Sequence, residues 1–172
     1  AATLGKIRSP AAVEPLIDAL LLGDRRLGHV VVRALGMMGE PAIRPLLRVL
    51  KNGDNTSRKG AVEAFVMIGE PAARLLPGAL TDEHFRVRAG VADALDRLNW
   101  SPSTAEETVR YLIAKERWSD LARSGVVAVE PLIQVLDDHD DSIRRRAARV
   151  LGEIGDPRAV SGLMNLLHDD FY

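Results

Sequence analysis

The sequence LGMMGEP at residues 35–41 returns as FVMIGEP at residues 65–71 and as LGEIGDP at residues 151–157. A looser copy lies at residues 4–10, and a degraded copy lies at residues 95–102. The first two full copies start 30 residues apart. Self-similarity at such a period indicates a repeat architecture, in which each repeat is one supersecondary unit and neighbouring repeats stack.

Each repeat is predicted to contain two helices. The motif ends in a proline that follows an acidic or hydroxyl residue, which we interpret as a helix cap followed by proline in the first turn. Apolar residues at helical spacing come next, and the segment AVEPLI occurs at both residues 12–17 and residues 128–133. A polar turn then precedes a second, one-sided helix. Its apolar stripe in the last full repeat is Ile143, Ala147, Val150, Leu151 and Ile154.

A single helix pair cannot bury both of its apolar faces, whereas stacked pairs can. The sequence therefore predicts an all-α fold, a right-handed α-solenoid (superhelix) of stacked antiparallel helix pairs. We expect one domain over residues 1–172, and because both ends cut through a repeat we expect a fragment of a longer array. The period breaks at residues 101–125, where we predict an irregular inserted unit with one helix over 103–116 and a short one over 118–123.

Composition narrows the possible functions. The chain has 172 residues, a formal net charge of −1 and 47% hydrophobic residues, which indicates a globular protein and argues against a dedicated polyanion binder. Cysteine is absent, which excludes disulfides and thiolate metal sites. No apolar run approaches the ~20 residues that span a bilayer. We therefore expect a cytoplasmic protein without a membrane partner.

The extended pattern LGxIG[DE]PxAVxPLI, with an arginine early in the second helix, resembles the HEAT-like repeats first named after phycobilisome lyases, which occur in many prokaryotic proteins. The arginine is present as Arg58, Arg88 and Arg144, and Gly28 takes its place in the first repeat. The resemblance covers the chain except about residues 100–125. It implies an armadillo-like α-solenoid, and it says little about the specific task because this scaffold serves many functions.

We predict no enzymatic activity, no cofactor and no metal, because the phosphate-loop, nucleophile-elbow and zinc-protease motifs are absent. A related architecture hydroxylates a modified lysine with metal-binding His-Glu pairs, but no histidine here precedes a glutamate. A weaker alternative is a divalent cation at the turns between helices, which imidazole and carboxylate groups would suit. The residues concerned are His84, His139 and His168 with Asp82, Asp138, Asp140 and Asp169.

Val30, Met37 and Met67 are the candidate apolar contacts with a partner. The second helix expected around residues 27–38 is apolar nearly all round, and such a helix is either fully buried or part of an interaction surface. Val30 and Met37 are about two turns apart and share one side. Two interpretations stay open: burial beneath a preceding repeat, or a patch on the concave second-helix surface that receives an amphipathic helix or a flexible peptide.

Three arginines are the candidate polar contacts. Arg145 and Arg149 are four residues apart and share a helix face, and Arg33 lies between Val30 and Met37 in the sequence. We predict a non-catalytic scaffold that binds a protein or peptide partner of unknown identity. One alternative is a tetrapyrrole (phycobilin) lyase or a lyase-like chaperone subunit. A third is nucleic-acid binding through the groove arginines, which the mixed charge at corresponding positions of other repeats disfavours.

Overall fold

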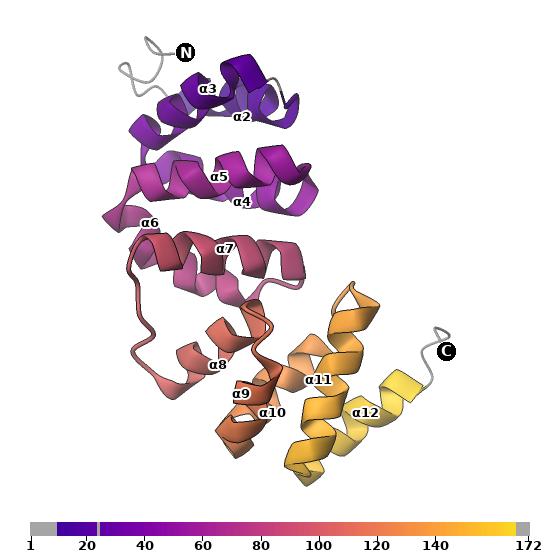
Figure 1. The fold of residues 1–172 in the computed structure, drawn as a ribbon. Coiled ribbons are helices and arrows are strands. Elements are labelled where there is room, and N and C mark those ends of the chain that lie inside the picture. The colour runs from indigo at the N-terminus through magenta and orange to yellow at the C-terminus, as the bar shows by residue number, and fades with distance from the viewer. Residues whose placement is uncertain (1–9, 24, 168–172) are drawn as a thin grey trace. The chain divides into compact units, whose positions relative to one another are not determined.

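The structure, a computed structural model, describes residues 10–23 and 25–167 (Figure 1). Within these two ranges every regular element is an α-helix or a 3-10 helix, and no strand occurs. The predicted all-α fold is confirmed. No helix in the described part is both long and apolar enough to cross a membrane. The chain forms two compact units, of which the first comprises residues up to 79 with 90–101 and the second residues 80–89 with those from 102 onward.

The first unit is a stack of helix pairs. Its helices are α2 (Val13–Leu21), α3 (Arg25–Met38), α4 (Ile43–Asn52), α5 (Asn55–Ile68), α6 (Glu70–Leu75) and the later part of α7 (Phe85–Arg97). In each pair a first helix such as α2 or α4 is followed by a second helix such as α3 or α5. Figure 1 shows α3 and α5 side by side, with α2 and α4 behind them. The second helices therefore form one layer of this unit and the first helices the other.

The second unit contains the irregular region and a further pair. Its helices are the start of α7, α8 (Ala105–Ala114), α9 (Trp118–Ser124), α10 (Val129–Val135), α11 (Asp141–Ile154) and α12 (Val160–Leu167). α8 and α9 match the two helices predicted for the irregular region. The first of them starts after Thr104, whose side chain accepts a hydrogen bond from the Glu107 N–H at 3.1 Å. A pair, α10 with α11, follows, and α12 is the last described helix.

Apolar stripes of the helices meet in the interior of each unit. The largest fully buried side chains of the first unit include Leu35, Leu46, Leu50, Phe65, Leu76 and Leu95. The second unit has one contiguous cluster that includes Ile113, Leu121, Leu132, Ile143, Val150 and Leu151. Except for Ile113 and Leu121 of the irregular region, these are positions at which the repeat pattern places apolar residues. Burial of these stripes between neighbouring helices is the main source of stability.

The glycine before the acidic residue and proline of the repeated motif turns the chain from one pair into the next. Gly39 and Gly69 have φ angles of 71° and 77°, a conformation that residues with a Cβ rarely adopt. The predicted capping by the residue before proline is wrong at these two sites, because the glycine itself occupies the N-cap position. Glu40 and Glu70 lie inside the first turn instead. Asp156 does cap its helix, accepting a backbone N–H at 2.9 Å.

The repeated arginine closes the turn between the two helices of its own repeat. In each case the guanidinium donates to a backbone carbonyl oxygen of the preceding turn. The three bonds run from Arg58 to Gly53 at 2.6 Å, from Arg88 to Asp82 at 2.8 Å and from Arg144 to Asp138 at 2.8 Å. The first repeat has Gly28 at this position and therefore has no such hydrogen bond.

Replacing Leu151 with Ala is expected to lower the free energy of unfolding by about 2–5 kcal/mol, because a large buried side chain leaves a cavity that its neighbours fill only in part. Leu151 is 1% exposed. Denaturant unfolding followed by circular dichroism measures the change. Val126→Ala is the control, since Val126 is 61% exposed and should change stability by less than about 0.5 kcal/mol. An unfolding midpoint unaltered by Leu151→Ala would contradict the repeat register.

Candidate functional site

α3 leaves part of its apolar surface open. Val30 and Met37 are 40% and 39% exposed, whereas Val31, Leu35 and Met38 on its other sides are buried. At these two positions the apolar side chains of α3 are therefore not fully covered by neighbouring helices, and no polar side chain of α3 takes their place. This is the exposure that contact with a partner requires.

Met67 of α5 extends this surface across the neighbouring second helix. It is 48% exposed, and the inner part of its side chain lies against Gly36 of α3. A Cβ atom at Gly36 would come within 2.6 Å of the Met67 Cβ and 3.5 Å of its Sδ. Met67 therefore packs on α3 at Gly36, the residue before Met37 in the sequence. We refer to Val30, Met37 and Met67 as the methionine face.

Charged groups accompany the methionine face. Arg33 lies one turn from both Val30 and Met37 on α3 and is exposed. Among the described residues, no hydrogen bond or ion pair engages the Arg33 side chain. A cation is therefore available between two exposed apolar side chains.

A hollow of about 310 Å³ opens between α2, α3 and α5. Its polar lining includes His29, Lys59 and Glu63, and its apolar lining includes Leu20 and Val32. In the repeat pattern, His29 and Lys59 correspond to Arg145, and Glu63 corresponds to Arg149. The structure thus places both signs of charge around one concavity of the first unit.

The glycines inside the second helices permit close packing. A Cβ at Gly60 would lie 2.8 Å from Leu20 Cδ1, and one at Gly90 would lie 2.6 Å from Leu50 Cδ2. Both contacts are with a first helix. Gly60 also lines the hollow, where the missing side chain leaves room.

The arginine run of α11 is largely neutralised by ion pairs. Arg145 pairs with Asp141 one turn away, and Arg146 pairs with Glu116, which follows the end of α8. Arg149 is exposed, and within the described ranges its side chain has no ion pair or hydrogen bond. The run is therefore not a continuous basic track.

Carboxylates at helix starts are held in the charged form. The Arg158 guanidinium, which donates to Asp156 at 2.9 Å, lowers the pKa of that carboxyl to about 2. A hydrogen bond from the Ser142 side chain lowers the pKa of Asp140. These groups stay ionised at neutral pH and stabilise helix termini. They are not suited to proton transfer near pH 7.

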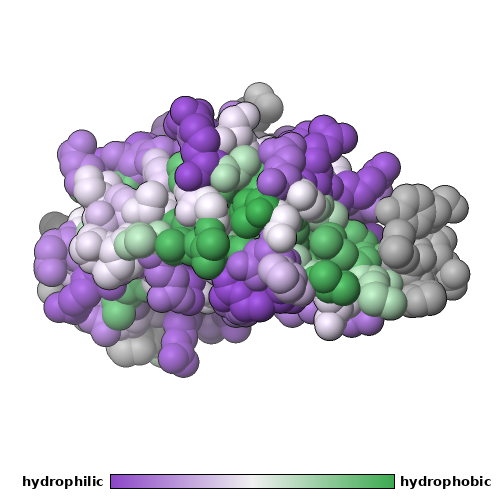
Figure 2. All heavy atoms as spheres, turned by 90° about the horizontal axis from the view of Figure 1, so that it is seen from below, coloured by the Kyte–Doolittle hydropathy of each residue, from purple (hydrophilic) through white to green (hydrophobic). Residues whose placement is uncertain are grey.

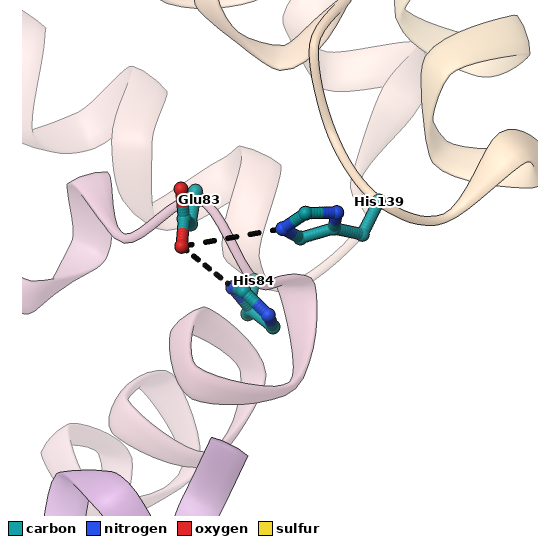
Figure 3. A group of neighbouring side chains, drawn as sticks. All are labelled: Glu83, His84 and His139. Carbon is teal, nitrogen blue, oxygen red and sulfur yellow. Dashed lines mark ion pairs between the residues drawn. The ribbon is translucent and has the colours of Figure 1, made fainter. Parts of the chain in front are cut away.

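Three residues of the second unit could together hold a metal ion: Glu83, His84 and His139 (Figure 3). Both histidines belong to the weaker cation alternative predicted from the sequence, but with different carboxylates. Asp138 instead pairs with buried Arg88 at 2.5 Å, and Asp140 caps α11. His168 and Asp169 lie outside the described residues. Glu83 was missed because a single exposed glutamate in a turn gives no signal in the sequence.

Comparison with known protein families finds repeats along most of the chain. The family model described as HEAT repeats matches residues 1–66, 22–96 and 103–172. The chain belongs to the HEAT-repeat family. Because the third match begins at residue 103, it also includes most of the irregular region, which the sequence resemblance had left out. No curated protein matches the chain.

HEAT repeats generally serve as scaffolds for protein–protein interaction. Membership in the family agrees with a surface built from side chains of successive second helices. The more specific expectations, a prokaryotic origin and the phycobilisome-lyase type, stay predictions.

Replacing Gly36 with Ala should destabilise this HEAT array. The added Cβ gains about 1 kcal/mol of helix propensity, but it meets the Met67 Cβ, which cannot move without its backbone, and such overpacking costs about 1–3 kcal/mol. Gly28→Ala in the same helix is the matched control, because nothing lies within 4 Å of its added Cβ. Urea unfolding should place Gly28→Ala at or above the wild type and Gly36→Ala below it. The reverse order would show that α3 and α5 are not in close contact at Gly36.

Proposed function

We propose that this chain is a non-catalytic scaffold that binds a protein partner through its second-helix surface, with the methionine face as the apolar centre of the contact. The observation that carries the proposal is the exposure of Val30, Met37 and Met67, between 39% and 48%, on two helices that pack directly against each other. Exposed apolar side chains that gather across adjacent elements are typical of interaction surfaces.

The spacing of the side chains suggests the form of the partner. Val30 and Met37 are separated by about 10.5 Å along α3, at 1.5 Å per residue. An amphipathic helix or an extended segment can place two apolar residues at such a distance. Methionine is flexible and polarizable, so Met37 and Met67 can adapt to side chains of different shape.

The charge of the surface suggests the partner's polar chemistry. Arg33 lies between the two apolar positions of α3, and Lys59 is exposed on α5. A carboxylate of the partner placed between its apolar anchors would pair with Arg33, and arginine binds carboxylates in a fixed geometry. We therefore propose a peptide segment that combines apolar residues with at least one acidic residue. In the second unit, Arg149 and Arg145 are proposed to make further acidic contacts, for which Arg145 would exchange its ion pair with Asp141 for one with the partner.

The two alternatives have weaker support. Nucleic-acid binding calls for a basic surface, but the chain carries a net charge of −1 and most arginines near the start of α11 are paired. A tetrapyrrole-binding role would use Arg33 beside Val30 and Met37 for the propionate groups. No observation favours a tetrapyrrole over a peptide at this place.

Peptides selected from a random display library on the intact chain would test the proposal. The double substitution Val30→Ser with Met37→Ser should weaken binding of the selected peptides at least tenfold, because it removes apolar contacts without emptying the core. Met164→Ser is the control, since Met164 is 56% exposed on α12 and lies outside the methionine face. Fluorescence anisotropy measures the affinities.

Two results would contradict this account of the surface. One is equal binding of the peptides by the wild type and the double variant. The other is a loss of several kcal/mol in unfolding free energy in the double variant, which would make Val30 and Met37 core residues. Reversal of Arg145 and Arg149 to Glu, tested with the same peptides, shows whether α11 contributes. A steep loss of affinity with added salt and a preference for DNA over the peptides would favour nucleic-acid binding instead.

A further inference from the structure

We propose that Glu83, His84 and His139 form a binding site for a divalent transition-metal ion of the zinc type. Glu83 and His84 lie in the turn that precedes α7, and His139 lies in the turn between α10 and α11 (Figure 3). All three belong to the second compact unit, although His139 is far from the other two in the sequence. The site is distinct from the methionine face, which lies in the first unit.

The three ligand atoms are already close to coordination distance. His84 Nδ1 is 3.3 Å from Glu83 Oε1, and His139 Nε2 is 4.0 Å from the same oxygen. All three atoms lie within 4.8 Å of one another. Ligands around a tetrahedral zinc ion with bonds of ~2.1 Å are about 3.4 Å apart. Small side-chain rotations of Glu83 and His139, which are 66% and 64% exposed, suffice to close the difference.

The chemistry of the donors fits zinc. Two imidazoles and one carboxylate are a ligand set that binds this ion with a fourth position left to water. Imidazole ligands favour zinc, copper or nickel over magnesium or calcium, which prefer sites made of oxygen alone. The His84 and His139 rings have their centroids 4.2 Å apart and are tilted by 58°. Such neighbouring rings can both direct a nitrogen at one ion.

His84 gives the second observation. Its Nδ1 atom is buried and makes no hydrogen bond, although Glu83 Oε1 lies 3.3 Å away. Burying a nitrogen that makes no hydrogen bond is unfavourable, because the atom loses its hydrogen bonds to water. A metal ion at the position between Glu83 and His139 would satisfy this atom.

The two turns that carry the ligands are fixed by one buried ion pair. The Arg88 guanidinium donates to Asp138 at 2.5 Å, and both side chains are almost fully buried. It also donates to the carbonyl oxygens of Asp82 and Glu83 at 2.8 and 3.2 Å. Asp138 in turn accepts the backbone N–H of Asp140 at 2.8 Å. The backbone on both sides of the proposed site is therefore held in place before any ion binds.

A bound ion would add a second link between these turns. Glu83 and His84 are joined to α7, and His139 leads into α11, so the ion would connect the starts of two second helices. An ion that binds only the folded unit stabilises it in proportion to the logarithm of its concentration. With three protein ligands, the fourth position of the ion would be open to a water molecule.

Zinc titration of the intact, metal-free chain tests the proposal. Isothermal titration calorimetry should show one ion per chain, and cobalt should give the visible absorption bands of a tetrahedral nitrogen and oxygen site. The wild type should also melt at a higher temperature with zinc than with a chelator. His139→Ala and Glu83→Gln should each weaken zinc binding at least tenfold and abolish the gain in melting temperature.

His29→Ala is the matched control, because His29 is an exposed histidine of the first unit. This variant should bind zinc as the wild type does. His139 and Glu83 are largely exposed, so their variants should keep the wild-type circular dichroism spectrum without metal. The proposal is overturned if the wild type binds no zinc at micromolar concentration. It is equally overturned if His139→Ala and Glu83→Gln bind zinc as tightly as His29→Ala does.

Discussion

A helix pair of about thirty residues has two apolar faces and can cover only one of them by itself, so each pair must stack on a neighbour. This constraint decides which side of every helix is apolar. In the first unit it places Leu35 of α3, Leu46 of α4 and Phe65 of α5 in a common interior from which water is excluded. It also requires close approach between helices, which Gly36 and Gly60 provide by having no side chain. The remaining surface of the second helices is not needed for packing of the core.

Figure 2 shows that apolar side chains also reach the surface of the second unit. The exposed ones there include Val126, Val127, Val160 and Met164. Nothing in the part of the chain that the structure describes indicates what covers them. The methionine face is therefore the stronger candidate for recognition, since it combines exposed apolar groups with an arginine whose side chain has no partner among the described residues.

Much of the fold follows from local periodicity. The repeated motif predicts the helix pairs, and the break in the period predicts α8 and α9, because helix formation depends on residues three or four apart. Pairing between distant side chains is not contained in such patterns. The Arg88–Asp138 pair joins residues 50 positions apart, and Glu116 neutralises Arg146 from 30 positions away. For the same reason the sequence indicates His84 and His139 as possible ligands but not Glu83, whose carboxylate lies near both rings in the folded chain. The acidic residue before the motif proline was predicted to cap a helix, because acidic side chains are common at N-caps. At Gly39 and Gly69, however, the glycine occupies the N-cap position with a positive φ angle.

The central claim is that exposed side chains on α3 and α5, and not the core, recognise the partner. Methyl NMR of the four methionines tests it most directly, because they report on different places: Met37 and Met67 on the methionine face, Met38 in the core and Met164 on α12. A soluble paramagnetic probe should broaden the signals of Met37, Met67 and Met164 and spare that of Met38. Addition of a display-selected peptide should then protect Met37 and Met67 and leave Met164 broadened. Protection of Met164 alone, or of none of the four at saturating peptide, would contradict the account.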